Sequence, residues 1–236
     1  MNPKNIEEKE INDIHCKLLD RYGQPEEPKD LTGTEYLVET ILSQNTNDKN
    51  RDKAFNNLQE KYDNWEEVET SSEEELTDTV RVAGLGPTKA ERIQKALKII
   101  RESDKGDKTY SIEFLEKMDV EEGKKWLTDI PGIGPKTAAV ILCFHFQKPV
   151  IPVDTHVHRI AQRFGLVPEN CSRNRTHEIL ETIVPDQIKY SLHILLITHG
   201  RKTCKSRHHA DNQNCFERCR HYQEVVKGDK NPDEVV

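Results

Sequence analysis

The sequence predicts an all-α protein, and three observations lead to this fold class. Apolar residues recur at the three- and four-residue spacing of an amphipathic helix along almost the whole chain. The one strand-like run, residues 148–153, contains two prolines and is better described as an extended link. Hydrophobic and charged residues make up 34% and 33% of the 236 residues, which suits a soluble protein with a thin core made of helix faces.

Five helices are expected in the first part of the chain, over 5–22, 34–43, 48–62, from Ser71 through Val80, and over 87–102. The first ends before Gly23, a residue typical of helix ends, and the fourth begins with a capping box of Ser71 and Glu74. Their apolar stripes contain Ile11, Ile14 and Leu18; Tyr36, Leu37 and Ile41; Phe55, Leu58 and Tyr62; Leu76 and Val80; and Ile93, Leu97 and Ile100.

Six more helices follow, over 111–118, 121–128, 136–146, 155–164, 173–184 and 186–199, and Asp186 is expected to cap the last of them. The polar tail after Tyr222 is expected to be frayed. No run approaches the ~18 apolar residues of a membrane span, and the polar start MNPKNIEEKE does not match a signal peptide. We therefore expect a cytoplasmic protein without a membrane partner.

Charge is unevenly distributed. The net charge is −7, which by itself argues mildly against a nucleic-acid partner. Residues 60–78 contain nine acids and one base, whereas residues 189–220 contain seven bases, four histidines and two acids. One face of the molecule can therefore be cationic although the whole chain is acidic.

A short motif occurs twice, at residues 83–90 and 131–138, and each copy is a Gly-aliphatic-Gly-Pro turn that runs into an expected helix. The glycines permit positive φ angles, the proline suits a first helical turn, and the aliphatic residue can fold back as a plug between two helices. In the second copy the turn would expose backbone N–H groups at a helix N-terminus, which is a phosphate site without a basic side chain. An ordinary helix–turn–helix corner is the alternative.

Lys136 and Asp154 are the two residues with catalytic potential. Lys136 falls in the first turn of a helix, where the dipole favours a neutral, nucleophilic amine, and burial in a cleft would act in the same direction. Asp154 precedes the helix over 155–164 and could stabilise positive charge or accept a proton. The simpler interpretations are a solvated surface lysine and an aspartate that only caps its helix.

The segments IPGIGPKTAAVIL (130–142) and IPVDTHVHRIAQRFGL (151–166) resemble the helix-hairpin-helix and Gly/Pro…Asp (HhH-GPD) signature of the endonuclease III family of DNA glycosylases. Three further segments resemble that family in the same order along the chain: ILSQNTND (41–48), VAGLGPTKAERI (82–93) and HGRKTC (199–204). The resemblance covers about residues 10–222. It is specific to the family and much less specific about the base removed.

The resemblance implies two helical lobes with DNA across the cleft between them. One six-helix lobe would span 25–148, and the second would combine 1–24 with 149–222, followed by a polar tail over 223–236. Lys136 would be the catalytic lysine and Asp154 the catalytic aspartate, facing each other across the junction. The implied DNA-binding residues are Gln44, which enters the duplex, Leu85 as an apolar wedge, His156 at the pocket, the hairpin residues Gly132, Ile133, Gly134 and Thr137, and the basic residues Lys202, Lys205 and Arg207.

The implied function is base excision repair by a bifunctional enzyme that removes a damaged base, by default an oxidised pyrimidine, and cleaves the abasic site through a lysine Schiff base. Its partner would be double-stranded DNA with a damaged or mismatched base, bound by a nucleoid-associated monomer. The alternatives are a monofunctional or mismatch (thymine or uracil) glycosylase, a non-catalytic helix-hairpin-helix protein that binds DNA, and a metal-binding regulator built on the terminal cysteines.

The terminal cysteines depart from the family pattern. The family's [4Fe–4S] loop has the spacing C-x6-C-x2-C-x5-C, whereas this chain has only Cys204, Cys215 and Cys219, with ten and three residues between them. The open alternatives are a cluster with another fourth ligand, a zinc site completed by a histidine, and a metal-free basic loop. The candidate fourth ligands are Cys171, His208, His209 and His221.

Overall fold

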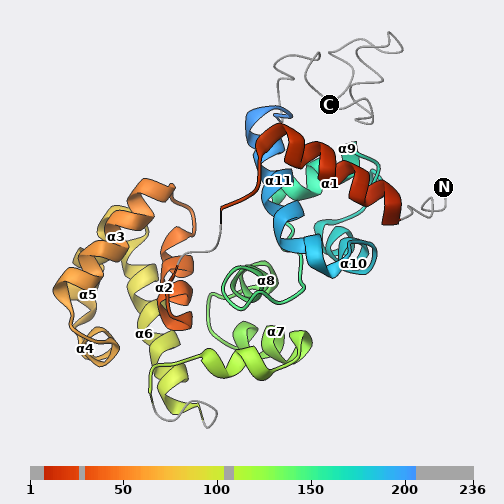
Figure 1. Ribbon diagram of the computed structural model, residues 1–236. Helices are drawn as coiled ribbons and strands as arrows, with labels where there is room; N and C mark the ends of the chain where they lie inside the picture. Colours follow the sequence, from red (N-terminus) through yellow and green to blue (C-terminus); the bar gives the residue numbers. More distant parts are fainter. Residues whose placement is uncertain (1–7, 27–29, 104–108, 206–236) are drawn as a thin grey trace. The chain divides into compact units, whose positions relative to one another are not determined.

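A computed structural model describes residues 8–26, 30–103 and 109–205, and this part of the chain is helical, with no strand (Figure 1). The all-α prediction is confirmed. The chain divides into two compact units, Pro28–Lys148 and a second formed by Met1–Glu27 with Pro149–Val236. No helix in the described part is long and apolar enough to cross a membrane.

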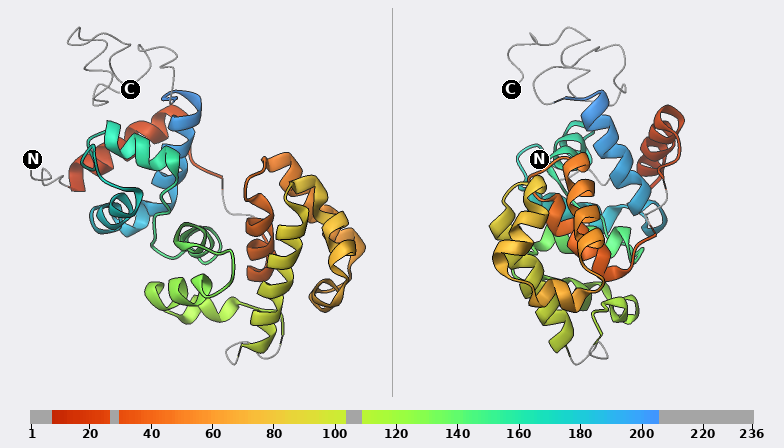
Figure 2. Two further views of the ribbon diagram at one scale, coloured as in Figure 1. Left: turned by 180° about the vertical axis from the view of Figure 1, so that it is seen from behind. Right: turned by 90° about the vertical axis from the view of Figure 1, so that its left-hand side faces the viewer.

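The described part of the unit 28–148 contains seven α-helices and two 3₁₀-helices. In it α6 packs against α2, α4 and α5, and α8 packs against α2 and α7 (Figure 2). The predicted stripe of Ile93, Leu97 and Ile100 on α6 is completely buried. The elements are α2 (Gly33–Ser43), α3 (Asp48–Lys61), α4 (Trp65–Thr70), α5 (Glu73–Val80), η1 (Arg81–Ala83), α6 (Gly86–Glu102), η2 (Glu113–Lys117), α7 (Val120–Thr128) and α8 (Pro135–Phe144).

The second unit combines the first described helix with the last. Helix α11 packs against α1 and α9, and Ile11, Ile14 and Leu18 of α1 join the core (Figure 1). The Tyr22 hydroxyl lies 2.9 Å from His199 Nδ1 and 2.7 Å from Thr203 Oγ1, which ties the end of α1 to the end of α11. The elements are α1 (Glu8–Tyr22), α9 (Thr155–Arg163), α10 (Arg173–Ile183), η3 (Asp186–Ile188) and α11 (Lys189–Lys202).

Three helix predictions near polar residues need correction. The helix predicted to open at Ser71 is instead capped by Ser72, whose hydroxyl accepts a hydrogen bond from Glu75 N at 3.2 Å. The preceding residues form the unpredicted short helix α4, in which Asn64 Oδ1 accepts from Glu67 N at 3.0 Å. Two serines follow α4. Ser71 is the C-cap residue of α4, and Ser72 is therefore the one that caps α5.

The other two corrections concern one element in each unit. The helix predicted over 111–118 is the 3₁₀-helix Glu113–Lys117. Asp186 does not cap α11: it opens a 3₁₀ turn, and its carboxylate pairs with Lys189 Nζ at 2.8 Å. Lys189 is buried, so its ammonium group needs a charged partner, and the Asp186 carboxylate is one.

Candidate DNA-binding and catalytic site

The second hairpin joins α7 to α8 through a tight turn. Gly132 has φ +87°, and Ile133 N donates to Ile130 O at 3.0 Å, which turns the chain back on itself. Ile133 is only 4% exposed, so here the aliphatic residue is the plug that the sequence predicts. The turn residue that needs the left-handed region is therefore the glycine, and the isoleucine stays in an ordinary conformation.

The helix of this hairpin begins without a side-chain cap. Seven helices of the described chain have a side-chain cap, the residues being Thr32, Asn47, Asn64, Ser72, Asp119, Asp154 and Ser172. In α8 the cap position is Gly134, and in α6 it is Leu85; no side chain bonds either helix start. Helix α11 also lacks such a cap, but it continues directly from a 3₁₀ turn. Both hairpin helices thus leave first-turn N–H groups for a ligand, and an anion is the ligand that the dipole favours.

Lys136 and Thr137 follow Gly134 in the first turn of α8. The Lys136 side chain is exposed and Thr137 is partly buried. The burial considered for Lys136 from the sequence is therefore not found in this structure. An exposed amine beside an uncapped helix N-terminus can approach a bound sugar-phosphate, which suits a nucleophile.

The first hairpin is built differently at its apex. Leu85 has φ +52° and is 56% exposed, the only large hydrophobic side chain in the described chain that is exposed. The plug interpretation is therefore wrong for Leu85. A left-handed conformation costs a leucine roughly 1–2 kcal/mol, and exposing it forgoes its burial. Strain held at an exposed apolar residue is typical of functional positions, and the wedge role of Leu85 stays a prediction.

Gln44 lies beside the second hairpin. It ends α2, and its Nε2 donates to Gly132 O at 3.1 Å while its Oε1 accepts from Arg92 Nη1 at 2.6 Å. The structure therefore brings Gln44 next to the turn of the predicted phosphate site, although 88 residues separate Gln44 from Gly132. Arg92 is a residue that the sequence reasoning missed.

Asp154 is the cap of α9 in the other unit. Its Oδ1 accepts from Val157 N at 2.7 Å, and the side chain is partly buried. The capping interpretation is thus realised, and it fixes the orientation of the carboxylate. Lys136 and Asp154 belong to different units, so their pairing across a cleft stays a prediction.

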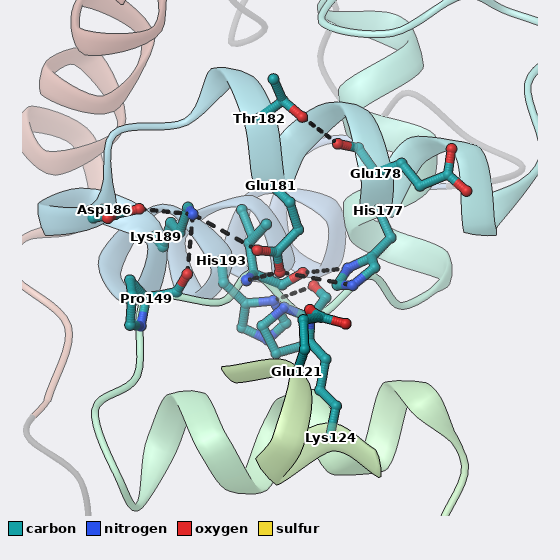
Figure 3. A network of polar contacts seen from close by, with 12 residues as sticks. Glu121, Lys124, Pro149, His177, Glu178, Glu181, Thr182, Asp186, Lys189 and His193 are labelled. Atoms are coloured by element: carbon teal, nitrogen blue, oxygen red, sulfur yellow. Dashed lines mark hydrogen bonds and ion pairs between the residues drawn. The ribbon is translucent and has the colours of Figure 1, made fainter. Parts of the chain in front are cut away.

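The extended link before Asp154 is held by side chains (Figure 3). Glu181 of α10 accepts from Ile151 N at 2.9 Å, and Lys189 of α11 donates to Pro149 O at 2.9 Å. His193 Nδ1 lies 2.7 Å from Pro152 O, and His177 Nδ1 lies 3.0 Å from Ile151 O. Because a carbonyl can only accept, both imidazoles donate from Nδ1.

These side chains take the place of a neighbouring strand, which would otherwise satisfy the backbone of a proline-interrupted segment. Lys189 also pairs with Glu181 Oε2 at 3.6 Å, so the two groups that hold the link hold each other. The link is fixed as far as Pro152, two residues before the carboxylate. Nothing in the local sequence pattern identifies Glu181 or His193 as part of this site, because their partners are backbone atoms.

His156 packs against α11. Its Nδ1 accepts from Arg159 Nη2 at 3.2 Å, and a Cβ built on Gly200 would lie 3.0 Å from the same nitrogen. Burial lowers the pKa of His156 below its ordinary value, against the opposing effect of the Asp154 carboxylate. The imidazole is therefore neutral at physiological pH.

Six residues near the C-terminus were predicted to bind DNA or a metal. Lys202, Cys204 and Lys205 lie in the described chain, whereas Arg207, Cys215 and Cys219 lie outside it. The two lysines are exposed. Cys204 is completely buried, and Arg163 Nη1 lies 2.9 Å from its sulfur. Within the described residues no group of three histidine, cysteine or carboxylate side chains could hold a metal. Because Cys215 and Cys219 lie outside the described residues, this finding concerns Cys204 and its described neighbours alone.

Two hairpins whose helices begin without a side-chain cap, an exposed lysine in the first turn of one of them, and an aspartate that caps another helix define the class of protein: a helical protein whose hairpins suit the binding of phosphate groups. Residues 38–186 match the family model described as "HhH-GPD superfamily base excision DNA repair protein". The chain belongs to this family of base excision repair DNA glycosylases, to which endonuclease III belongs.

Relatives agree with this assignment. Endonuclease III of Thermotoga maritima is 31% identical over 221 residues, covering 93% of this chain and 96% of its own. A putative DNA glycosylase of Arabidopsis thaliana is 36% identical over 197 residues, covering 82% of this chain, which spans 65% of that relative. The solved structure of a trapped endonuclease III–DNA covalent intermediate has a TM-score of 0.76 at 26% identity, covering 93% of this chain and 98% of its own.

Proposed function

We propose that this glycosylase is bifunctional, removing a damaged base from duplex DNA and then cleaving the abasic site. The observation that carries the proposal is the exposed Lys136 in the first turn of α8, on the hairpin whose uncapped N-terminus suits a phosphate. By default the substrate is an oxidised pyrimidine. Relatives named endonuclease III, together with the similar structure of a trapped covalent intermediate with DNA, support a mechanism in which the protein bonds covalently to DNA.

In the proposed reaction the hairpin amides hold the backbone and the damaged nucleotide leaves the stack, which costs a few kcal/mol. Unprotonated Lys136 Nζ attacks C1′, the glycosidic bond breaks, and the base leaves with the electron pair and takes up a proton. The sugar ring opens to a Schiff base. Loss of a C2′ proton then breaks the C3′–O bond, which nicks the strand 3′ to the lesion.

Asp154 would support the positive charge that develops at C1′ and accept a proton from the attacking amine. Its hydrogen bond from Val157 N keeps the carboxylate in one orientation. The held link 149–152 would keep that cap in place on its unit. Asp154 would thus act at C1′ and at the attacking amine, whereas Val157 and the link would only hold the Asp154 carboxylate in position.

Borohydride trapping tests the proposal, because only an imine is reduced to a stable protein–DNA adduct. Wild-type protein and the matched control Lys125→Gln, which removes the same charge from exposed Lys125 of α7, should form the adduct on a duplex with an oxidised pyrimidine. Lys136→Gln should form none while duplex affinity stays within a few-fold, because the phosphate contacts come from backbone amides. An adduct with Lys136→Gln would overturn the assignment.

A second variant tests Asp154. Asp154→Asn retains a capping side chain, so the melting temperature should be unchanged, whereas turnover should fall by about 10²–10³-fold. Base loss without nicking in the wild type, revealed by a separate abasic-site cleavage step, would identify a monofunctional enzyme.

A further inference from the structure

Arg92 joins three parts of the unit 28–148. It belongs to α6, the helix of the first hairpin, and its Nη1 donates to Gln44 Oε1 at 2.6 Å. Its side chain also covers the turn of the second hairpin: a Cβ built on Gly132 would lie 2.6 Å from Arg92 Cδ and 2.7 Å from Nε. Gln44 Nε2 closes the triangle by donating to Gly132 O at 3.1 Å.

This arrangement fixes the orientation of the Gln44 carboxamide. A guanidinium has only donors, so the atom that faces Arg92 must be the accepting Oε1. The donor Nε2 then faces the carbonyl of Gly132, which can only accept. Rotating the amide by 180° would place donor against donor and acceptor against acceptor. The hydrogen bond from Arg92 is charge-assisted and is therefore the stronger of the two.

Gly132 is required here for two reasons. Its φ of +87° disfavours any side chain, and the Arg92 side chain occupies the space that a Cβ would need. The second hairpin thus accommodates Arg92 as well as its own turn. A surface arginine that only contributed charge would not need to pack so closely against the Gly132 backbone.

We propose that Arg92 is a positioning residue that holds Gln44 in a single rotamer and amide orientation for entry into the duplex. The inference rests on the proposed function and on the role that the family resemblance implies for Gln44, which is to enter the duplex where the base has left. A free glutamine samples many rotamers, and a side chain that is ordered before binding loses less entropy on entering DNA. Arg92 would therefore raise the preference of the protein for a duplex whose base has already left.

The probe is a duplex with a tetrahydrofuran abasic analogue, which cannot form a Schiff base, compared with the same duplex undamaged. The measured quantity is the ratio of the two affinities. Arg92→Met and Gln44→Ala should each lower this ratio by about 5–20-fold, and the double variant should lower it no further than either single one. Arg92→Lys keeps the charge but offers a point donor, and should recover only part of the preference.

Lys95→Met is the matched control, since it removes one exposed positive charge from the same helix. It should change both affinities by the same factor, because phosphate contacts do not distinguish the two duplexes. Equal melting temperatures of the variants would show that the folded unit is intact.

The outcomes distinguish a failure of the role given to Gln44 from a failure of the positioning role given to Arg92. If Gln44→Ala leaves the ratio unchanged, the proposed role of Gln44 fails and the role of Arg92 falls with it. If Gln44→Ala lowers the ratio and Arg92→Met lowers it further by its full amount in the double variant, Arg92 acts independently and this inference is overturned. Because the analogue cannot react, neither result depends on whether Lys136 is the nucleophile.

Discussion

The two hairpins share a Gly-aliphatic-Gly-Pro turn, but the aliphatic residue is buried in one and exposed in the other. In the second hairpin Gly132 adopts the positive φ and Ile133 is 4% exposed; in the first, Gly84 and Leu85 both have positive φ and Leu85 is 56% exposed. The extra left-handed residue turns the leucine outwards. The same four-residue motif therefore gives a plug in one place and an exposed apolar tip in the other.

The lysines of the two hairpins differ by one position. Thr88-Lys89 in the first hairpin corresponds to Lys136-Thr137 in the second. One residue corresponds to roughly 100° around a helix, so Lys89 faces the core and Lys136 faces solvent. Lys89 is buried and donates to Leu42 O at 2.7 Å and Ala83 O at 2.8 Å. One lysine thus anchors its hairpin, and the other is accessible for chemistry.

The largest effect is expected when Lys136 and Thr137 exchange places, because the second hairpin then has its lysine at the position that Lys89 occupies in the first. In the variant Lys136→Thr/Thr137→Lys the lysine moves to the partly buried position, so borohydride trapping should fall by at least about 10³-fold, as expected for loss of a nucleophile. Composition and charge are unchanged, and the melting temperature shows whether the fold is intact. Wild-type trapping by this folded variant would contradict the argument from helical position.

Truncating the two apex residues should separate stability from DNA binding. Ile133→Ala removes buried atoms and should lower the free energy of unfolding by about 2–4 kcal/mol. Leu85→Ala should change it by less than about 0.5 kcal/mol, because the side chain is exposed. Leu85→Ala should instead weaken binding to an abasic-analogue duplex. Urea denaturation and the binding ratio measure the two effects, and equal loss of stability would show that Leu85 is also a plug.

Lys89→Met should have a moderate effect on stability that depends on pH. The loss of two hydrogen bonds to buried carbonyls should cost about 1–3 kcal/mol at neutral pH. Burial lowers the pKa of Lys89 below its ordinary value of 10.5. Between the lowered pKa and 10.5 the unfolded chain binds more protons than the folded one, so this group makes stability rise with pH.

That rise should be absent in Lys89→Met. The control is the difference in unfolding free energy between wild type and variant, measured from pH 7 to pH 10.5, because other titrating groups cancel in it. A difference that does not change over this range would show that Lys89 titrates normally in the folded protein.

The smallest effect concerns three basic residues at the end of α11 and just after it. If the hairpins bind phosphate through backbone amides, side chains elsewhere must supply the salt-dependent attraction on this acidic protein. Neutralising Lys202, Lys205 and Arg207 together should weaken binding to any duplex and reduce the salt slope by up to about 0.9 per lost contact. Preference for a damaged duplex should stay the same. An unchanged slope would place this segment away from DNA.

The helical pattern predicted most of the fold because each apolar stripe is local information. The stripe residues of α1 and α6 are buried as expected, and the link 148–153 is extended. Short polar stretches were harder: α4 and the cap at Ser72 depend on which of several serines and acids bond the backbone. Cap-forming residues occur close together there, and the sequence offers no energy difference large enough to choose between them.

For the candidate site, the sequence suggested which residues to consider but not which atoms they contact. The roles of Lys136, Asp154, Gln44 and Leu85 follow from a resemblance and stay predictions, although Asp154 is a cap as its position suggested. Arg92, Glu181 and His193 were missed. Their partners are a distant side chain or backbone atoms, and neither leaves a periodic or motif signal in the chain.

The sequence by itself determined that this protein is helical, where its two hairpins begin and to which repair family it belongs, because periodicity and short motifs are encoded within a few turns of chain. Only the tertiary structure decided which apex is exposed, that Lys89 is buried, and that Arg92 meets Gln44 across 48 residues. The physical reason is that these outcomes depend on which faces pack together. A one-residue step around a helix, or one extra positive φ, then changes a side chain from a core group into an exposed one.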